Sequence, residues 1–388
     1  MVRVLEGVRV IDFSFRLNGS YCSLLLGDMG AEVIRIDRTR MPPELIQLQQ
    51  EILIPTGRNK KSITLNLRTE RGQEIFARLA KQSDVIVSTY LPDAAKRLGI
   101  DYETVERINS NIVYCSLTGY GQDGPYRDRP SHDVDCLGIS GVLGIPGSLV
   151  ELPSKPGIAL ATLSSNVFAF ATILAALLVR PKIGRGQFID VGAADVLFSW
   201  ASVRAAEYML KGTLPGIEEW GHISAASDVF PTKDGKRIVL ALVDDGLWRN
   251  FCDAVGRPDL VKDEHFSNNS KRRENWKELH TTLEELMLSK TRDEWNEILS
   301  NKEIAFSPVN EINEAFDDPH FNYRGLIQEL NYPGIGQIKQ VAFPAKFSQT
   351  PADIRTPPPS PGQDTEDILR SLGYSTEEIA EFHPTGVI

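Results

Sequence analysis

Cysteine is scarce in this 388-residue chain, which has only Cys22, Cys115, Cys136 and Cys252. None of the four has the close spacing of a disulfide framework or a metal site, so we expect reduced, buried thiols of a cytoplasmic protein and no bound metal. Acidic residues outnumber basic ones, 52 to 42, which gives a formal net charge of −10. This excess argues against nucleic acid as a partner, because such proteins carry a basic field.

The sequence also lacks a long uninterrupted apolar run. Residues 1–13 do not contain the apolar core of a signal peptide, and the apolar stretch 167–179 is too short and too interrupted to cross a bilayer. We therefore expect a soluble chain with no membrane partner. The composition, 41% hydrophobic and 24% charged, is typical of globular proteins, and the length allows two or three domains.

Several catalytic signatures are absent as well. No GxGxxG motif comes directly after the first predicted strand, where the dinucleotide-binding fingerprint lies, and this disfavours a dinucleotide-dependent oxidoreductase. The chain has no Walker loop and no HExxH, CxxC or GxSxG motif. We expect no tightly bound cofactor.

The first half of the chain alternates between apolar strands and helical segments. Predicted strands occupy residues 8–11, 33–36, 62–67, 84–87, 112–115 and 188–191, and predicted helices occupy residues 21–29, 69–81 and 165–180, the last of them ending at Pro181. Short strands separated by helices of this length indicate βαβ units and a mainly parallel sheet. The expected fold class is α/β.

The pattern changes after residue 227. A hairpin-like segment turning at Asp234-Gly235 precedes amphipathic helical segments at 248–255, 276–288 and 292–299. We interpret residues 228–325 as a second, smaller α+β domain. Long linkers are predicted near 200–227 and 322–360, with a proline-rich extended stretch at 351–361.

Two short polar segments are candidates for chemistry. Residues 58–61, Arg-Asn-Lys-Lys, are either a phosphate-binding lip or a solvated run of charge, and the second is the more frequent use of such a run. His132-Asp133 is either an acid/base pair or a loop cap, and the cap is again the more frequent role. Composition and spacing indicate a small-molecule α/β enzyme and go no further.

Longer motifs resemble one protein family. Residues 5–14 (LEGVRVIDFS), 24–37 (LLLGDMGAEVIRID) and 118–125 (TGYGQDGP) are similar to the family III CoA-transferases, the CaiB/BaiF family, which also contains the α-methylacyl-CoA racemases. The agreement continues through 184–187 (GRGQ) to 372–375 (LGYS) and so covers nearly the whole chain. The resemblance implies a CoA-transferase whose substrates are an acyl-CoA and a carboxylic acid. It also implies a large Rossmann-like domain of residues 1–200 and 330–388, with the smaller domain of residues 228–325 inserted into it. The two subunits of a dimer would be interlocked as rings.

The resemblance further implies a set of CoA contacts. These residues are Arg38, Leu65, Arg68, Thr89, Tyr90 and Arg97, with Arg16, Leu17 and Asn18 at the mouth of the site, and also His132. Guanidinium groups suit the diphosphate and the 3′-phosphate of CoA because they present fixed, bidentate donors. An acidic protein can therefore still bind this anionic ligand.

One departure from the family concerns the nucleophile. Family transferases use an aspartate that forms an anhydride and then a CoA thioester, eleven residues before an Ile-Leu-Ala-Ala-Leu segment. In this chain that segment begins at Ile173, and the position holds Thr162. A threonine ester is far less reactive than an aspartyl anhydride, so Thr162 is a poor substitute.

Three hypotheses follow from this departure. In the preferred one, the chain is the aspartate-lacking subunit of a heterodimer with a homologous chain. In the second it is a stand-alone transferase or racemase-like enzyme, a homodimer, that uses His132, Asp133, Asp135 or Glu151. In the third it binds acyl-CoA without chemistry. The resemblance leaves homodimer and heterodimer both open.

Overall fold

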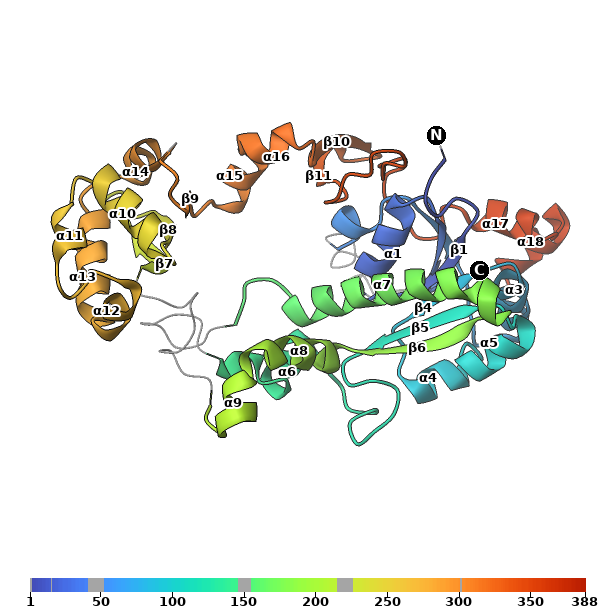
Figure 1. The fold of residues 1–388 in the computed structure, drawn as a ribbon. Coiled ribbons are helices and arrows are strands. Elements are labelled where there is room, and N and C mark those ends of the chain that lie inside the picture. The colour runs from blue at the N-terminus through green and yellow to red at the C-terminus, as the bar shows by residue number, and fades with distance from the viewer. Residues whose placement is uncertain (1, 15, 41–51, 146–154, 215–225, 301) are drawn as a thin grey trace. The chain divides into compact units, whose positions relative to one another are not determined.

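The computed structural model describes residues 2–14, 16–40, 52–145, 155–214, 226–300 and 302–388. The chain divides into two compact units. Unit 1 consists of residues 1–142, 156–200 and 319–388, and unit 2 of residues 143–155 and 201–318. Figure 1 shows the elements of both.

Unit 1 is built on a six-stranded sheet in the order β3-β2-β1-β4-β5-β6, and every neighbouring pair is parallel. The strands are β1 (Arg9–Phe13), β2 (Glu32–Asp37), β3 (Lys60–Thr64), β4 (Val85–Ser88), β5 (Val113–Thr118) and β6 (Gln187–Gly192). The predicted α/β class with a parallel sheet is confirmed. The strand order reverses between β1 and β4, and ligands of open parallel sheets bind outside the carboxyl ends of the strands at such a point.

Helices cover both faces of this sheet. On one face α1 and α7 belong to the core, and on the other α3, α5 and α17 do. The helices of unit 1 are α1 (Ser20–Asp28), α3 (Glu70–Lys81), α4 (Pro92–Arg97), α5 (Tyr102–Ile108), α6 (Asp133–Ile139), α7 (Leu160–Ile183), α8 (Ala193–Ala201), α16 (Pro319–Tyr323), α17 (Thr365–Ser371) and α18 (Thr376–Phe382), and a 3₁₀ turn at Val142–Gly144 follows α6. Alternate strand residues feed two cores: Ile11 and Ile34 belong to one buried cluster, and Val10 and Val33 to the other. Because successive strand side chains point to opposite faces, the two cores lie on opposite sides of the sheet.

Helix α7 is longer than the sequence pattern predicts. It runs past Pro181 and ends at Gly184, which adopts a left-handed φ of +70°. The prediction that Pro181 ends the helix is wrong: it lies in the last turn, where its missing N–H removes a single hydrogen bond, and the left-handed glycine provides the actual cap. The helix is long and apolar enough to cross a membrane. However, Ala169 and Ile173 are buried in the core, and α7 contacts α1, β5 and β6, so it is a core helix of a soluble protein.

Unit 2 has its own antiparallel sheet and helices. The sheet has the order β7-β8-β9, and its members are β7 (Ser227–Pro231), β8 (Arg237–Ala241) and β9 (Phe306–Pro308). The helices are α9 (Ala206–Lys211), α10 (Asp245–Ala254), α11 (Asp259–Lys262), α12 (Asn269–Glu274), α13 (Trp276–Met287), α14 (Arg292–Leu299) and α15 (Ile312–Asp317), with a 3₁₀ turn at Ser202–Arg204. A core that includes Trp248, Phe251 and Trp295 joins β7 and β8 to α10, α11, α13 and α14. The predicted hairpin is β7–β8, and it turns at Gly235 with φ +75°.

The stretch 322–360, which the sequence predicts as a linker, contains a second hairpin. It pairs β10 (Ile327–Tyr332) with β11 (Gly336–Val341). Gln340 of this hairpin is buried and accepts a hydrogen bond from Arg58 at 3.0 Å, which fixes the hairpin to the segment just before β3. Residues 351–360 form neither helix nor strand, as predicted for the proline-rich stretch.

Candidate functional site

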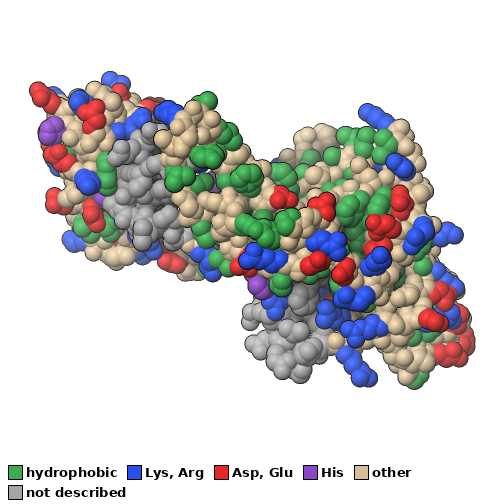
Figure 2. Space-filling model, turned by 90° about the horizontal axis from the view of Figure 1, so that it is seen from below, with side chains coloured by type: hydrophobic (Ala, Val, Ile, Leu, Met, Phe, Trp, Pro, Cys, Tyr) green, Lys and Arg blue, Asp and Glu red, His purple; other side chains and the backbone are tan. Residues whose placement is uncertain are grey.

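A cavity of about 730 Å³ opens where β1, β2, β3 and β4 end. Its lining residues are Phe13, Ile36, Asp37, Arg38, Thr39, Arg40, Leu65, Asn66, Leu67, Arg68, Tyr90, Ala94, Arg97 and Leu98. Five of the predicted CoA contacts therefore line one cavity, namely Arg38, Leu65, Arg68, Tyr90 and Arg97. We call it the arginine-lined cavity. The net charge of the chain is −10, yet Lys and Arg side chains gather on part of the face shown in Figure 2.

The carboxylate in this lining is already paired within the protein. Asp37, at the end of β2, accepts hydrogen bonds from Arg35 at 2.7 and 2.9 Å and from the Ser62 hydroxyl at 2.6 Å. Arg35 and Asp37 are both buried. Because Asp37 is neutralised from behind, the arginines determine the charge of the cavity, which suits a polyanionic ligand.

The loop after β1 passes close to the loop after β4. A Cβ at Gly19 (φ +76°) would lie 2.8 Å from Ser14 Cβ and 2.9 Å from Thr89 Cγ2, so only glycine allows this approach. Asn18 donates a hydrogen bond to the Leu117 carbonyl at 3.3 Å and ties the same loop to β5. The predicted mouth residues, Arg16 to Asn18, thus lie on a loop fixed between β4 and β5.

A buried ion pair lies beneath this loop. The Lys60 ammonium contacts Asp12 at 3.0 Å, the Ser23 hydroxyl at 2.8 Å and the hydroxyl and carbonyl oxygens of Ser20. Burial alone would raise the pKa of Asp12, but the Lys60 charge and hydrogen bonds bring it below its usual value. Burial also lowers the pKa of Lys60, and the Asp12 charge opposes that change.

Both sequence-based interpretations of residues 58–61 are wrong for most of the segment. Arg58, Asn59 and Lys60 are buried, and Arg58 pairs with Asp28 at 2.6 Å. The segment is neither a phosphate lip nor a solvated charge run, because its partners come from α1, β1 and β11. It joins β3 and the residues before it to α1, β1 and β11.

The second group of predicted residues lies where α6 and α7 begin. The Asp133 carboxylate accepts a hydrogen bond from the backbone N–H of Thr162 at 2.9 Å. This bond satisfies a free N–H in the first turn of α7 and places a negative charge at the positive end of the helix dipole. Asn166 holds the same turn by donating to the Thr162 carbonyl at 2.7 Å and accepting from the Cys22 N–H at 2.9 Å.

His132 is exposed and precedes α6, and its own N–H donates to Asp135 at 3.0 Å. The structure brings Asp133 and Thr162 into contact. The residues that line the arginine-lined cavity, among those the structure describes, do not include His132, Asp133 or Thr162. Glu151 lies outside the described residues.

Nine of the fourteen residues that line the arginine-lined cavity are not among the predicted CoA contacts, and three of them are of particular interest. Arg40 lies two residues beyond Arg38 and carries a further guanidinium, and its charge just after a predicted strand was the available signal. Phe13 and Asn66 also line the cavity. Phe13 packs edge-on against Tyr90 with ring centroids 6.2 Å apart, and no local pattern indicates that contact.

Comparisons with known proteins agree with this fold. Residues 5–365 match the family described as CoA-transferase family III. Human succinyl-CoA:glutarate CoA-transferase is 31% identical over 398 residues, which cover 100% of this chain and 90% of the human protein. A crystal structure of a CaiB/BaiF family protein from Brucella suis has a TM-score of 0.83 at 27% identity, covering 96% of this chain and 100% of the other.

Relatives from Chloroflexus aurantiacus include both subunits of one heteromeric enzyme. The alpha subunit of succinyl-CoA–L-malate CoA-transferase is 31% identical, covering 99% of this chain and 92% of that protein. The beta subunit is 28% identical, covering 99% of this chain and 98% of that protein.

Proposed function

Because the chain belongs to CoA-transferase family III, we propose that it acts as the aspartate-lacking subunit of a heteromeric transferase. As a family III CoA-transferase, it moves CoA between an acyl-CoA and a carboxylic acid. Its proposed partner is a homologous chain with an aspartate at the position of Thr162. Residue 162 is the observation that carries the proposal: it is a threonine where the family resemblance predicts the aspartate, whereas five of the predicted CoA contacts do line one cavity.

The partner's aspartate would perform the covalent chemistry. Its carboxylate attacks the thioester carbonyl of the acyl-CoA, the CoA thiolate leaves, and a mixed anhydride forms. The thiolate then attacks the aspartyl carbonyl, releases the first acid and gives an aspartyl-CoA thioester. The second acid attacks this thioester to form a new anhydride and free the thiolate, which attacks the acyl carbonyl of the new acid and restores the aspartate.

The role of this chain would be to bind CoA and support its partner. Arg38, Arg68 and Arg97 would hold the diphosphate and 3′-phosphate of CoA, which is a substrate rather than a resident cofactor. The other predicted contacts, including Thr89 and the loop from Arg16 to Asn18, would position the rest of the molecule. Relatives named for glutarate and for L-malate support a dicarboxylic acid as the acyl acceptor, with succinyl-CoA as the donor.

The assembly and location belong to the same proposal. Val167 and Phe168 of α7 and Phe198 of α8 are large apolar side chains exposed on unit 1, as expected for a surface covered by a second subunit. We keep the interlocked arrangement and the division into domains 1–200 with 330–388 and 228–325 as proposals. The four cysteines are buried free thiols, which fits the reducing cytoplasm.

A stand-alone enzyme is the second candidate, and one contact favours it. The Asp133 carboxylate lies 2.9 Å from the backbone nitrogen of residue 162, so it is a carboxylate at the start of α7 in place of the missing one. It could then act as the nucleophile, with His132 as an adjacent acid or base. A binding protein without chemistry has less support, because the relatives reported above are named as transferases.

The test is to compare the purified chain alone with the complex recovered from its source. Native mass spectrometry of the tagged protein should show a second chain of similar mass that carries the aspartate. Transfer of CoA from succinyl-CoA to glutarate or L-malate should require both chains. Full turnover by a homodimer of this chain would overturn the heteromeric proposal and favour the Asp133 alternative.

A further inference from the structure

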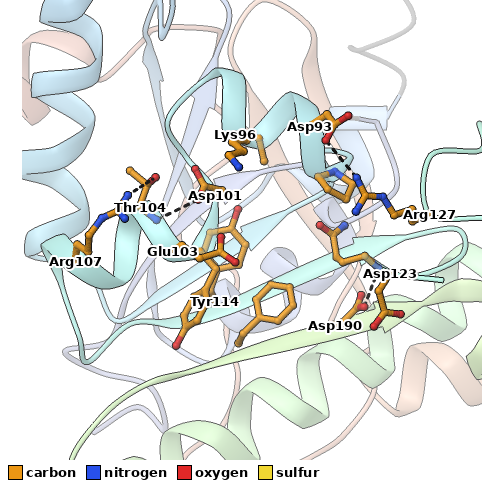
Figure 3. A pocket seen from close by; sticks show the side chains of 15 residues that line it. Asp93, Lys96, Asp101, Glu103, Thr104, Arg107, Tyr114, Asp123, Arg127 and Asp190 are labelled. Atoms are coloured by element: carbon orange, nitrogen blue, oxygen red, sulfur yellow. Dashed lines mark hydrogen bonds and ion pairs between the residues drawn. The ribbon is translucent and has the colours of Figure 1, made fainter.

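A second cavity, of about 610 Å³, borders a different face of α4 from the arginine-lined cavity. Helix α4 contributes Asp93 and Lys96 to this second cavity and Ala94 and Arg97 to the first. The remaining wall comes from α5, β5, β6 and the loop after β5, as Figure 3 shows. The proposed CoA-transfer reaction uses none of its lining residues, so we call it the second cavity and consider it separately.

Three aromatic rings form one wall of the second cavity. Tyr114 of β5 lies beside Phe188 of β6 in the sheet register, and Tyr102 of α5 packs on both, with ring centroids 5.3 to 6.0 Å apart. The hydroxyls of Tyr102 and Tyr114 already bond to Glu106 and to the Ile100 carbonyl. Phe188 is 38% exposed on this edge strand. The wall therefore offers ring surfaces to a flat or apolar group.

A carboxylate lies next to this aromatic wall. Asp190 follows Phe188 by two residues in β6, so both side chains share one face of the strand, roughly 7 Å apart along it. Asp190 accepts the Gln122 N–H at 2.7 Å through one oxygen, and Figure 3 shows Asp123 beside it. Although the residue is exposed overall, partial burial of its carboxyl raises the pKa of Asp190, and the charges of Asp123 and Asp195 add to this effect.

The basic residues of the second cavity do not neutralise Asp190 and Asp123. Arg127 is paired with Asp93 at 3.4 Å and with Asp128 at 3.1 Å, and Arg107 donates to the Thr104 hydroxyl. Figure 3 shows Lys96 and Arg107 away from Asp123 and Asp190. The acidic lining residues are Asp93, Asp101, Glu103, Asp123 and Asp190, and the basic ones are Lys96, Arg107 and Arg127. The second cavity is therefore acidic, unlike the arginine-lined one.

We propose that the second cavity binds an organic cation, with a flat or apolar body against Phe188 and Tyr102 and an ammonium, amidinium or guanidinium group held by Asp190 and Asp123. A cation beside aromatic rings gains cation–π attraction, and its N–H groups donate charge-assisted hydrogen bonds to the carboxylates. A free metabolite and an Arg or Lys side chain of another chain share this chemistry.

Benzamidine and benzoate test the proposal, because they share a ring and a size but carry opposite charges. Titration calorimetry on the full chain should detect benzamidine binding, with benzoate at least 10-fold weaker. Asp190→Asn and Phe188→Ala should each weaken benzamidine binding about 10-fold or more, a loss typical of one charged or aromatic contact. Asp367→Asn, which removes an exposed carboxylate on α17, is the matched control and should leave the affinity for benzamidine unchanged.

Further measurements distinguish a variant that has lost its fold from a folded variant whose binding contradicts the proposal. The Asp190→Asn variant should keep the wild-type urea midpoint and the wild-type affinity for CoA in the arginine-lined cavity. Equal affinity for benzamidine and benzoate, or undiminished benzamidine binding by folded Asp190→Asn, would overturn the proposal. Native mass spectrometry distinguishes the two sources. An unchanged assembly in Asp190→Asn indicates a free cation, and dissociation indicates a side chain from another chain.

Discussion

The arginine-lined cavity and the start of α7 differ in whether they contain the residues that the family resemblance predicts for them. The arginine-lined cavity contains Arg38, Arg68 and Arg97, and the paired Asp12 and Lys60 lie buried beneath the adjacent loop. At the start of α7, Thr162 stands where the family resemblance predicts the nucleophilic aspartate, and the Asp133 carboxylate accepts a hydrogen bond from its backbone N–H. A chain that keeps ligand recognition but not the reacting group needs that group from elsewhere, so the two regions together favour a supporting subunit.

Restoring the aspartate should give the largest effect. We expect Thr162→Asp to raise CoA transfer by the chain alone on the order of 10³-fold, since removing a nucleophile commonly costs this much or more. Thr162→Asn, which has the same shape without the charge, is the control and should stay at the wild-type rate. The assay follows CoA moving from succinyl-CoA to glutarate. No gain in a folded Thr162→Asp variant would mean that the start of α7 lacks more than one group.

Removing Asp12 should show how much its ion pair with Lys60, beneath the loop after β1, contributes to the free energy of unfolding. Asp12→Asn should lower the free energy of unfolding by about 3 kcal/mol, because Lys60 would remain buried without its counter-charge. The pKa of Asp12 is lower in the folded state, so its contribution is present above the ordinary carboxyl pKa and is lost as the pH falls through the folded-state value. Urea unfolding between pH 3 and 7 measures both effects.

The double variant Asp12→Leu with Lys60→Met is the control for this prediction. It removes both charges at once, so it should recover most of the stability and lose the acid dependence that comes from Asp12. If the single and double variants are equally unstable, packing rather than the ion pair supports the loop after β1.

The buried ion pair also shows where sequence reasoning stops. The strands of the sheet are predictable because their apolar residues follow one another locally, as in 8–11 and 84–87. The burial of Arg58 and Lys60 is not, because their partners lie 30 and 48 residues away in sequence, as Asp28 and Asp12. A local run of charged residues does not indicate which residues far away in sequence will pair with it.

The same limit applies to the candidate site. Of the arginines that line the first cavity, Arg38, Arg68 and Arg97 follow from the family resemblance, whereas Arg40 was missed. The contact between Asp133 and Thr162, and the packing of Tyr102 on Phe188, depend on how helices and an edge strand meet in space. The length of α7 was missed because its cap is a glycine three residues beyond the proline that usually ends a helix.

Substituting Arg97 tests whether the arginine-lined cavity binds CoA. We expect Arg97→Ala to weaken CoA binding roughly 10-fold to 100-fold, since a hydrogen bond to a charged group contributes about 1.5–3 kcal/mol. Arg97→Lys keeps the charge without the bidentate donors and should lose less. Titration with CoA and with dephospho-CoA gives the assignment: an equal loss for both ligands places Arg97 at the diphosphate, and a loss for CoA only places it at the 3′-phosphate. Unchanged affinity for both would remove Arg97 from the site.

The smallest expected effect separates the two roles open to Asp133. If its carboxylate only caps α7, Asp133→Ala should lower the free energy of unfolding by about 1 kcal/mol, whereas Asp133→Asn, which keeps an oxygen acceptor, should lose only a few tenths. Urea unfolding resolves the difference between these two variants. A nucleophilic role predicts another pattern, in which Asp133→Asn loses all turnover while unfolding at the same urea concentration as the wild type. In that case the start of α7 would hold its own reacting group, and the contrast with the arginine-lined cavity would no longer imply a second chain.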